Sequence, residues 1–220
     1  METGLNIKNL FSEVLKSAGP TAEARKNAFQ AFEALGMPTR TQEEWRYTSV
    51  KPLQTAWQLP KKSQIPKTIA TKESIQIHSL NGFFDLKEIA TSLHEFGILV
   101  DSAEGFLSTY NQTKPLQKNA FWHLGYAFLN QGLFLKVPDK TQVELPIVIN
   151  HMLEASNIFV STFVAIQLGK DATLSFAEKY ESQNEHTWIN SLTSGVIQEG
   201  ARLDFYKNYD ENKNSSHIDA

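Results

Sequence analysis

The chain of 220 residues contains no cysteine. Disulfide bonds, thiolate metal ligands and a cysteine nucleophile are therefore all excluded within it. No apolar run approaches the roughly 20 residues that a membrane-spanning helix needs. The opening residues also lack the basic leader and apolar stretch of a secretion signal. We therefore expect a soluble, cytoplasmic protein that binds no membrane.

Concentrated positive charge and enzyme motifs are missing as well. The formal net charge is -3, and no stripe of Lys and Arg alternates with aromatic residues, so we expect no nucleic-acid partner. The sequence contains no G-x-S-x-G, H-E-x-x-H or G-x-x-x-x-G-K motif and no Gly-rich dinucleotide loop. We predict a protein that is not an enzyme, with no catalytic residue and no cofactor-binding residue in this chain.

The first 115 residues contain helical segments and one short strand. Apolar residues recur every three to four positions over residues 7–15, 24–35 and 86–93. Residues 58–73 are polar and twice interrupted by proline, which is typical of a connector. Ile75 and Ile77 alternate with polar residues, as in a strand. These features predict a mostly helical N-terminal domain of mixed α/β content over residues 1–115.

From about residue 120 the apolar spacing changes to two, the period of a strand. The stretch ATLSFAEKY begins at Ala172, and ARLDFYKNY begins 29 residues later at Ala201, with four of nine positions identical. A weaker copy of the pattern begins at Val143. Strands that recur at a fixed period favour a parallel β-helix, in which Phe205 would stack on Phe176. A meandering antiparallel sandwich is the alternative. We predict the start of a β-helix domain over residues 116–220, and hence an α+β chain.

Three histidines carry the one candidate metal site. His151, His186 and His217 lie 35 and 31 residues apart, close to the repeat length, so they could form a row that binds iron or zinc. The simpler explanation is that they are separate surface or edge residues. We favour that explanation and predict no metal-binding residue.

Several segments together resemble one known family. G-M-P-T-R at residues 36–40 and E-W-R-Y-T at residues 44–48 are similar to the N-terminal signature of SufD proteins, which belong to the SufB/SufD family. Leu-Asn, Gly, Val-Pro and Pro-Ile at positions 129–147 resemble the entry into that family's core. Residues 168–180 and 199–207 look like its coils. The resemblance extends over nearly the whole chain.

This resemblance implies a helical domain followed by a right-handed parallel β-helix. It also implies a non-catalytic scaffold subunit of the Suf iron–sulfur cluster assembly complex, linked to iron acquisition. SufD proteins pair with SufB through their β-helices and bind the ATPase SufC through C-terminal helices. Because family members are longer, we expect these 220 residues to be an N-terminal portion, with partner contacts mostly beyond residue 220. No functional residue is therefore carried over. The alternative function is a β-helix or cupin-like metal-dependent enzyme.

Overall fold

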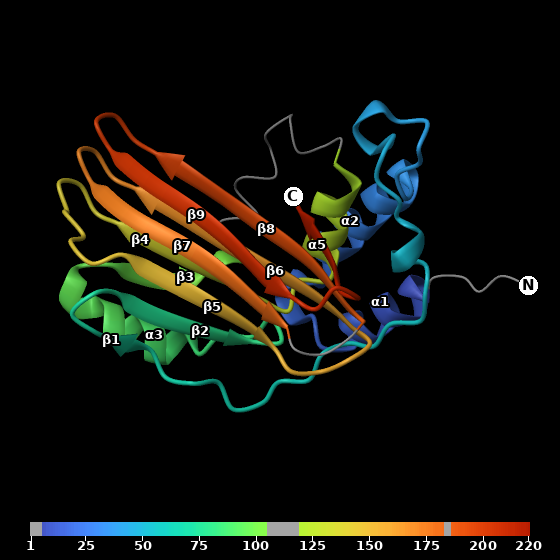
Figure 1. Cartoon of the computed structure of the whole chain (residues 1–220), viewed down its shortest axis with the longest axis horizontal. Helices are drawn as coiled ribbons and strands as arrows, with labels where there is room; N and C mark the ends of the chain where they lie inside the picture. The colour runs from blue at the N-terminus through green and yellow to red at the C-terminus, as the bar shows by residue number, and fades with distance from the viewer. Residues whose placement is uncertain (1–5, 105–118, 183–185) are drawn as a thin grey trace, which may run out of the picture.

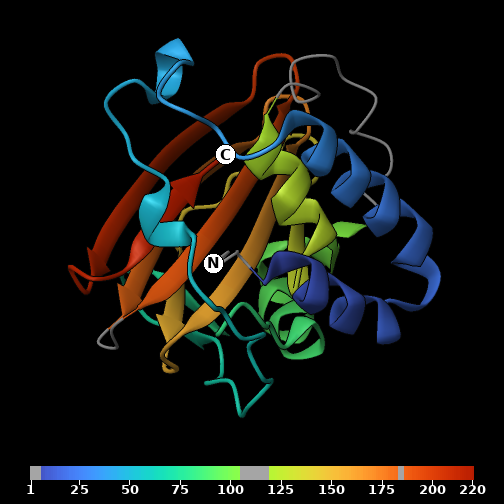
Figure 2. The same cartoon turned by 90° about the vertical axis from the view of Figure 1, so that its right-hand side faces the viewer.

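The computed structural model describes residues 6–104, 119–182 and 186–220 of the chain. Within these ranges the protein is a mixed α/β structure with two five-stranded, mostly parallel sheets. Figure 1 shows the long strands of the two sheets running side by side, and Figure 2 shows α1, α2 and α5 gathered along one side of them. The fold therefore combines a layer of helices with a parallel β-structure.

Four α-helices are present in the described ranges: α1 (Ile7–Lys16), α2 (Ala22–Leu35), α3 (Leu86–Leu93) and α5 (Ala120–Ala127). The first three confirm the helices that the apolar spacing of the sequence predicts. Each buries apolar residues of that spacing, as α1 does with Ile7, Leu10 and Phe11. Single 3-10 turns follow at Gly19–Thr21, Glu43–Trp45, Lys51–Leu53 and His94–Phe96.

Helix α5 corrects the prediction that strands begin at about residue 120. The first strand after it starts only at Gln131. Seven of the eight residues of α5 are buried, so the helix is apolar all round and has no stripe that would indicate a helical period. The side-chain carbonyl of Asn119 caps it by accepting the backbone N–H groups of Phe121 and Trp122 at 3.0 and 3.1 Å.

The first sheet has the strand order β1-β2-β5-β7-β9, and the second has the order β10-β8-β6-β4-β3. The strands of the first sheet are β1 (Ile69–Ala70), β2 (Ile75–Leu80), β5 (Ile147–Leu153), β7 (Thr173–Ser182) and β9 (Arg202–Glu211). Those of the second are β3 (Leu99–Ser102), β4 (Gln131–Val137), β6 (Ile158–Leu168), β8 (Thr187–Ile197) and β10 (Ser216–Asp219).

Successive strands from β6 onward alternate between the sheets. Each pairs in parallel with the strand two places before it in the sequence. In the described part of the chain the antiparallel pairs between strands are β1 with β2 and β3 with β4. Strands β2 and β3 therefore extend the same two sheets, although they precede residue 116. The division of the chain at residue 115 stays a prediction.

The 29-residue repeat sets the register of the first sheet. Phe176 on β7 lies opposite Phe205 on β9, and their rings stack with centroids 5.6 Å apart. Ile147 on β5 lies opposite Phe176, so the weaker copy pairs at the same offset. The predicted repeat is confirmed. The antiparallel sandwich is wrong, because these strands run parallel.

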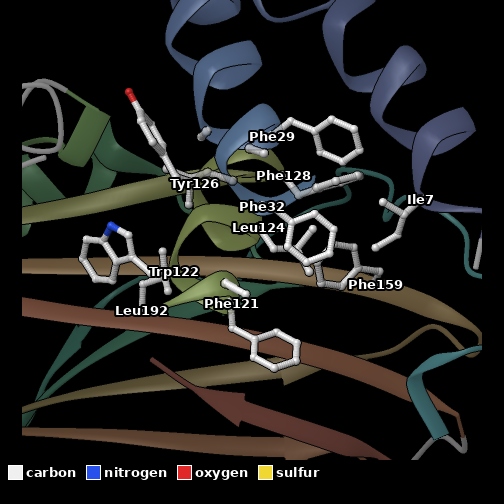
Figure 3. Close-up of a cluster of buried hydrophobic side chains, with 14 of the residues drawn as sticks. Ile7, Phe29, Phe32, Phe121, Trp122, Leu124, Tyr126, Phe128, Phe159 and Leu192 are labelled. Carbon is white, nitrogen blue, oxygen red and sulfur yellow. The ribbon is translucent and has the colours of Figure 1, made fainter. Parts of the chain in front are cut away.

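Two hydrophobic cores flank the second sheet. One lies between the sheets and contains Ile149 of β5 and Val164 of β6. The other lies between the helices and the outer face of β6 and β8. Figure 3 shows Phe29 and Phe32 of α2 close to Leu124 of α5, with Phe159 of β6 beneath them, all within one apolar cluster. The second sheet is therefore covered on both faces.

Three of the four tryptophans lie in the helix-facing core. Trp57, Trp122 and Trp188 are all buried. Trp45 is only partly buried and packs against the edge of this core, where its ring lies 5.1 Å from that of Phe121. It therefore remains partly accessible from outside.

Candidate functional site: a polar network between the sheets

The histidine row suggested by the sequence is not formed. His186 lies in an exposed turn before β8, with a φ of 56°. His151 on β5 and His217 on β10 belong to different sheets. Both rings contact the ring of Tyr180, at centroid distances of 4.2 and 4.6 Å. His151 is 2% exposed, so the alternative of a surface or edge residue is also wrong for it.

Polar side chains surround these rings in the space between the sheets. We call them the interior polar network: Ser79, His151, Glu178, Tyr180, Ser191, Thr193, Lys207, Tyr209, Glu211, His217 and Asp219. The parallel register aligns many of them from strand to strand. His151, Tyr180 and Tyr209 are direct neighbours on β5, β7 and β9. Glu178 and Lys207 are direct neighbours in the same way.

The deep end of the network is a fully enclosed histidine and carboxylate pair. Nε2 of His151 lies 3.2 Å from Oε2 of Glu178, and Nδ1 of His151 lies 2.8 Å from Oγ of Ser79. The hydroxyl groups of Tyr180 and Thr193 each donate to a different oxygen of Glu178, both at 2.7 Å. Glu178, Tyr180 and Ser79 are 0% exposed. Both oxygens of the carboxylate are thus satisfied inside the protein.

Burial and charge fix the protonation states of this pair. Burial lowers the pKa of His151 and outweighs the contacts with Glu178, which act to raise it. Burial acts to raise the pKa of Glu178, but its contacts with His151, Lys207 and Tyr180 hold that pKa below the usual value. Glu178 is therefore ionised and His151 is neutral. Because an ionised carboxylate only accepts hydrogen bonds, the proton of His151 lies on Nε2, and Nδ1 accepts from Ser79.

Tyr180 remains a phenol. Burial and the negative charge of Glu178 raise the pKa of Tyr180 well above its ordinary value, while hydrogen bonds with Thr162 and Ser191 act in the opposite direction. The protonated hydroxyl can donate to Glu178 and accept from a neighbour at the same time. Tyr180 therefore connects the deep pair with Thr162 on β6, whose hydroxyl lies 3.5 Å from that of Tyr180.

The outer end of the network lies on the last two strands. The ammonium of Lys207 lies 3.8 Å from Glu178 and forms an ion pair with Asp219. Oγ of Ser191 lies 2.8 Å from Oδ1 of Asp219 and 2.7 Å from Nε2 of His217. Nδ1 of His217 lies 2.8 Å from a carboxylate oxygen of Glu211. Contacts at these distances link the deep pair to the end of β10.

This outer end reaches the surface. Tyr209 is 47% exposed, and its hydroxyl donates to Asp219 at 3.0 Å. Burial acts to raise the pKa of Asp219, but Lys207, Ser191 and Tyr209 together lower it. The carboxylate of Asp219 is therefore ionised beside solvent. The network thus extends from the buried interior to a solvent-exposed edge of the protein.

A surface pocket of about 210 Å³ lies at the outer end of the network. His217 and Asp219 of β10 line it, together with Trp45 and Phe121. A larger pocket of about 760 Å³ shares Trp45 and Phe121 and continues to the C-terminal end of α2. The aromatic segment around Trp45 and the polar network therefore meet at one place on the surface.

The network is not a metal centre of three or more ligands. In the described ranges no three His, Asp or Glu side chains converge as metal ligands do. The two histidines are separated by Tyr180, and a lysine ammonium takes the position between the carboxylates of Glu178 and Asp219. The imidazoles of His151 and His217 and the carboxylates of Glu178 and Asp219 are each engaged by protein groups instead.

One pattern in the sequence could have revealed part of this network. In the repeat A-x-L-x-F-x-x-x-Y, the position between Phe and Tyr that faces inward holds Glu178 in one copy and Lys207 in the other. Inward charges of opposite sign at the same repeat position indicate an ion pair between neighbouring parallel strands. The contributions of β8 and β10 follow no such repeat and were not predictable in this way.

Comparison with known proteins addresses the N-terminal part of the chain. Residues 11–66 match the family model described as the SufBD protein N-terminal region. This region of the chain is therefore similar to the N-terminal region shared by the SufB and SufD proteins. No curated protein matches the chain significantly. No helix in the described ranges is long and apolar enough to cross a membrane.

The matched SufBD region includes most of α1, all of α2 and the segment that carries Trp45. The resemblance to the SufB/SufD family is thereby confirmed for residues 11–66, and the family model does not distinguish SufD from SufB. Trp45 lines the pocket at the outer end of the polar network, so the matched region and the network border the same pocket. This region also supplies Phe29 and Phe32 to the helix-facing core.

Proposed function

We propose that the protein is a SufD-type, non-catalytic scaffold subunit of the Suf system for iron–sulfur cluster assembly. The observation that carries this proposal is the match of residues 11–66 to the SufBD N-terminal region. After the matched region, the chain continues with strands that alternate between two parallel sheets with a 29-residue register. That combination supports the further proposal that β4 to β10 are the first coils of a right-handed parallel β-helix.

The partners follow from the same proposal. SufB, a β-helix relative, and SufC, the ATPase, are the expected partners. We place the protein in the cytoplasm, where the complex would assemble clusters and where this subunit would support iron acquisition. Iron and sulfide are then cargo of the complex, and this chain contributes shape and contacts rather than a catalytic group.

The alternative, a metal-dependent enzyme on a β-helix or cupin-like fold, lacks a specific observation in its favour. It would need several His, Asp or Glu side chains directed at one point. Within the described residues no such group of three exists. His151 and His217, the two candidates that come close to each other, are both engaged in hydrogen bonds with protein groups.

The test is co-purification of the tagged, full-length gene product from its own cells. After a high-salt wash, mass spectrometry should find an ATPase and a β-helix relative in constant ratio to the tagged protein. An untagged strain treated identically shows which proteins bind the resin alone. In a gene deletion, the activity of iron–sulfur enzymes should fall and return with the plasmid-borne gene. Recovery of the protein alone, with iron–sulfur enzymes unaffected, would refute the proposal.

A further inference from the structure

Two surface pockets join into one groove around Trp45. The pocket of about 760 Å³ and the pocket of about 210 Å³ share four lining residues, Glu44, Trp45, Asn119 and Phe121. We call the two pockets together the Trp45 groove. We propose that the Trp45 groove binds an arginine side chain presented by an extended segment of another protein. This proposal is independent of the Suf assignment, because it follows from the residues of the groove alone.

The segment that carries Trp45 stands out from the rest of the protein. It follows helix α2 and contains the 3-10 turn Glu43–Trp45. Figure 2 shows it as the light-blue segment that extends beyond the helices and strands. Tyr47 in the same segment is 90% exposed. The groove therefore lies beside a part of the chain that another macromolecule can reach.

The groove carries negative charge that no described residue neutralises. Glu43 and Glu44 are exposed and line the larger pocket, and neither forms an ion pair with another described residue. Asp219 lines the smaller pocket, but its charge is paired with Lys207. Among the described residues no lysine or arginine lines either pocket. A cation brought into the groove would therefore be attracted by two free carboxylates.

Aromatic rings accompany these carboxylates. The ring centroids of Trp45 and Phe121 lie 5.1 Å apart, and the ring planes are inclined by 43°. Tryptophan is the aromatic side chain that attracts cations most strongly. A guanidinium group is planar, stays charged and stacks on aromatic rings, whereas a lysine ammonium is more strongly hydrated. Leu35, which is 41% exposed, adds apolar surface to the larger pocket. The groove therefore suits an arginine with an apolar neighbour.

The start of helix α5 lies in the groove and does not call for an anion. The backbone N–H groups of Phe121 and Trp122 already donate to the side-chain oxygen of Asn119, at 3.0 and 3.1 Å. These are the groups by which a helix N-terminus usually attracts negative charge. Because Asn119 satisfies them within the chain, the free carboxylates set the preference of the groove.

Buried polar groups without partners lie directly behind the groove. Asn190 is 0% exposed, and its Nδ2 donates to the backbone oxygen of Phe121 at 2.7 Å. It is also the register neighbour of Ile218 on β10, and both Phe121 and Ile218 line the smaller pocket. Oδ1 of Asn190 and Nε1 of Trp188 have no hydrogen-bond partner among the described residues. Folded proteins rarely leave such groups unpaired, so this wall of the groove favours a ligand with polar groups.

The experiment uses N-acetyl-leucyl-argininamide as the probe. The whole chain, labelled with ¹⁵N, is titrated with this dipeptide, and NMR follows the indole N–H of Trp45 and the backbone amides of Glu44 and Phe121. These signals should shift together and saturate with a Kd of about 1–10 mM, as expected when one side chain makes the contact. The citrulline analogue has the same shape without the charge and should bind at least about fivefold more weakly. The proposal is overturned if no signal saturates by about 50 mM probe, or if the citrulline analogue binds equally well.

Charge variants locate the binding. Glu43→Gln combined with Glu44→Gln should raise the Kd of the dipeptide at least about fivefold, because both free carboxylates are lost. Glu73→Gln combined with Glu95→Gln removes the same charge from exposed positions outside the groove, and should leave the Kd unchanged. Equal effects of the two double variants would assign the binding to overall charge and overturn the proposal.

Aromatic variants test the second feature of the groove. Trp45→Leu should raise the Kd at least about threefold, as read from the amides of Glu44 and Phe121. Tyr47→Leu is the matched control in the same segment, because Tyr47 lines neither pocket, and it should bind like the wild type. An unchanged Kd in Trp45→Leu would contradict the proposed stacking. If the dipeptide instead converts a dimer of the chain into a monomer in light scattering, the groove holds a second copy of the chain and the proposal of a different protein is wrong.

Discussion

The imidazole of His151 lies parallel to the ring of Tyr180, with centroids 4.2 Å apart and planes 8° apart. The two residues are register neighbours on β5 and β7, so the parallel pairing itself creates this stack. Tyr209 continues it on β9, where its ring lies 5.9 Å from that of Tyr180. A polar stack of this kind requires that each polar group find a partner, because the surrounding interior is apolar.

The ion pairs that join β9 to β7 and β10 predict a large effect of a single lysine. Lys207→Met should lower the free energy of unfolding by about 3–5 kcal/mol, because it leaves the carboxylates of Glu178 and Asp219 without their cation. Denaturant unfolding measures this change. The double variant Glu178→Gln with Lys207→Met should cost less than the sum of the two single variants.

Lys179 provides the matched control for Lys207. It lies on the same sheet and pairs with Glu181, but both side chains are 37% exposed. Lys179→Met should therefore change the unfolding free energy by no more than about 0.5 kcal/mol. Similar losses of unfolding free energy for Lys207→Met and Lys179→Met would show that the buried ion pair stabilises the protein no more than the exposed one.

The neutral state of His151 predicts a specific pH dependence. Because burial lowers its pKa in the folded protein, the unfolded chain binds a proton at this position that the folded chain does not. The unfolding free energy should therefore fall as pH falls below about 6.5, by up to about 1.4 kcal/mol per pH unit for this one group. The loss should continue until the pH reaches the lowered folded value.

His151→Gln should flatten this part of the curve, since Gln can accept from Ser79 and donate to Glu178 without titrating. Denaturant unfolding at about six pH values between 7.5 and 5 measures the slope of the unfolding free energy against pH. His186→Gln, in the exposed turn outside the network, is the control and should keep the wild-type slope. An unchanged slope in His151→Gln would contradict the assignment of a neutral His151.

The β-structure could be predicted from the sequence because the 29-residue repeat sets the pairing register of the strands. Leu174 and Phe176 recur as Leu203 and Phe205, and these pairs lie opposite each other on β7 and β9. Identical residues at inward positions are what stacked coils require. Helix α5 was missed because Phe121, Trp122 and its other buried residues face protein on every side, which leaves no amphipathic period to detect.

The polar network was only partly within reach of sequence reasoning. Opposite charges at positions 178 and 207 were visible once the repeat was aligned. The partners from the second sheet were not, since Ser191 and His217 lie in strands without a repeated motif. Which residues of the two sheets face each other depends on how the turns position the strands. A local sequence pattern does not predict that position.

The repeat also predicts an unequal effect of two equivalent phenylalanines. Phe176 and Phe205 stack in register, but they are 1% and 40% exposed, respectively. Phe176→Ala should cost about 3–5 kcal/mol of unfolding free energy, because it opens a cavity between the sheets. Phe205→Ala should cost about 1 kcal/mol, the typical loss for a partly exposed side chain. Equal losses in denaturant unfolding would mean that the end of the β-structure is packed as tightly as its middle.

Strand β9 predicts self-association of this chain. It is an edge strand of the described part of the first sheet, and Phe205, Tyr206 and Tyr209 on it are 40%, 69% and 47% exposed. A long edge with exposed aromatic residues pairs readily with another strand. Sizing with light scattering should therefore show a dimer fraction that grows with concentration.

A charge on this edge should prevent the association. Phe205→Lys places a cation on the inward side of β9, the device by which natural edge strands avoid pairing, and it should shift the protein to monomer. Tyr47→Lys introduces the same charge at a residue that is 90% exposed and outside the sheets, so it should leave the dimer fraction unchanged. If wild type elutes as a monomer at every concentration, the edge is protected in solution. Equal loss of dimer in both variants would instead assign the association to overall charge rather than to β9.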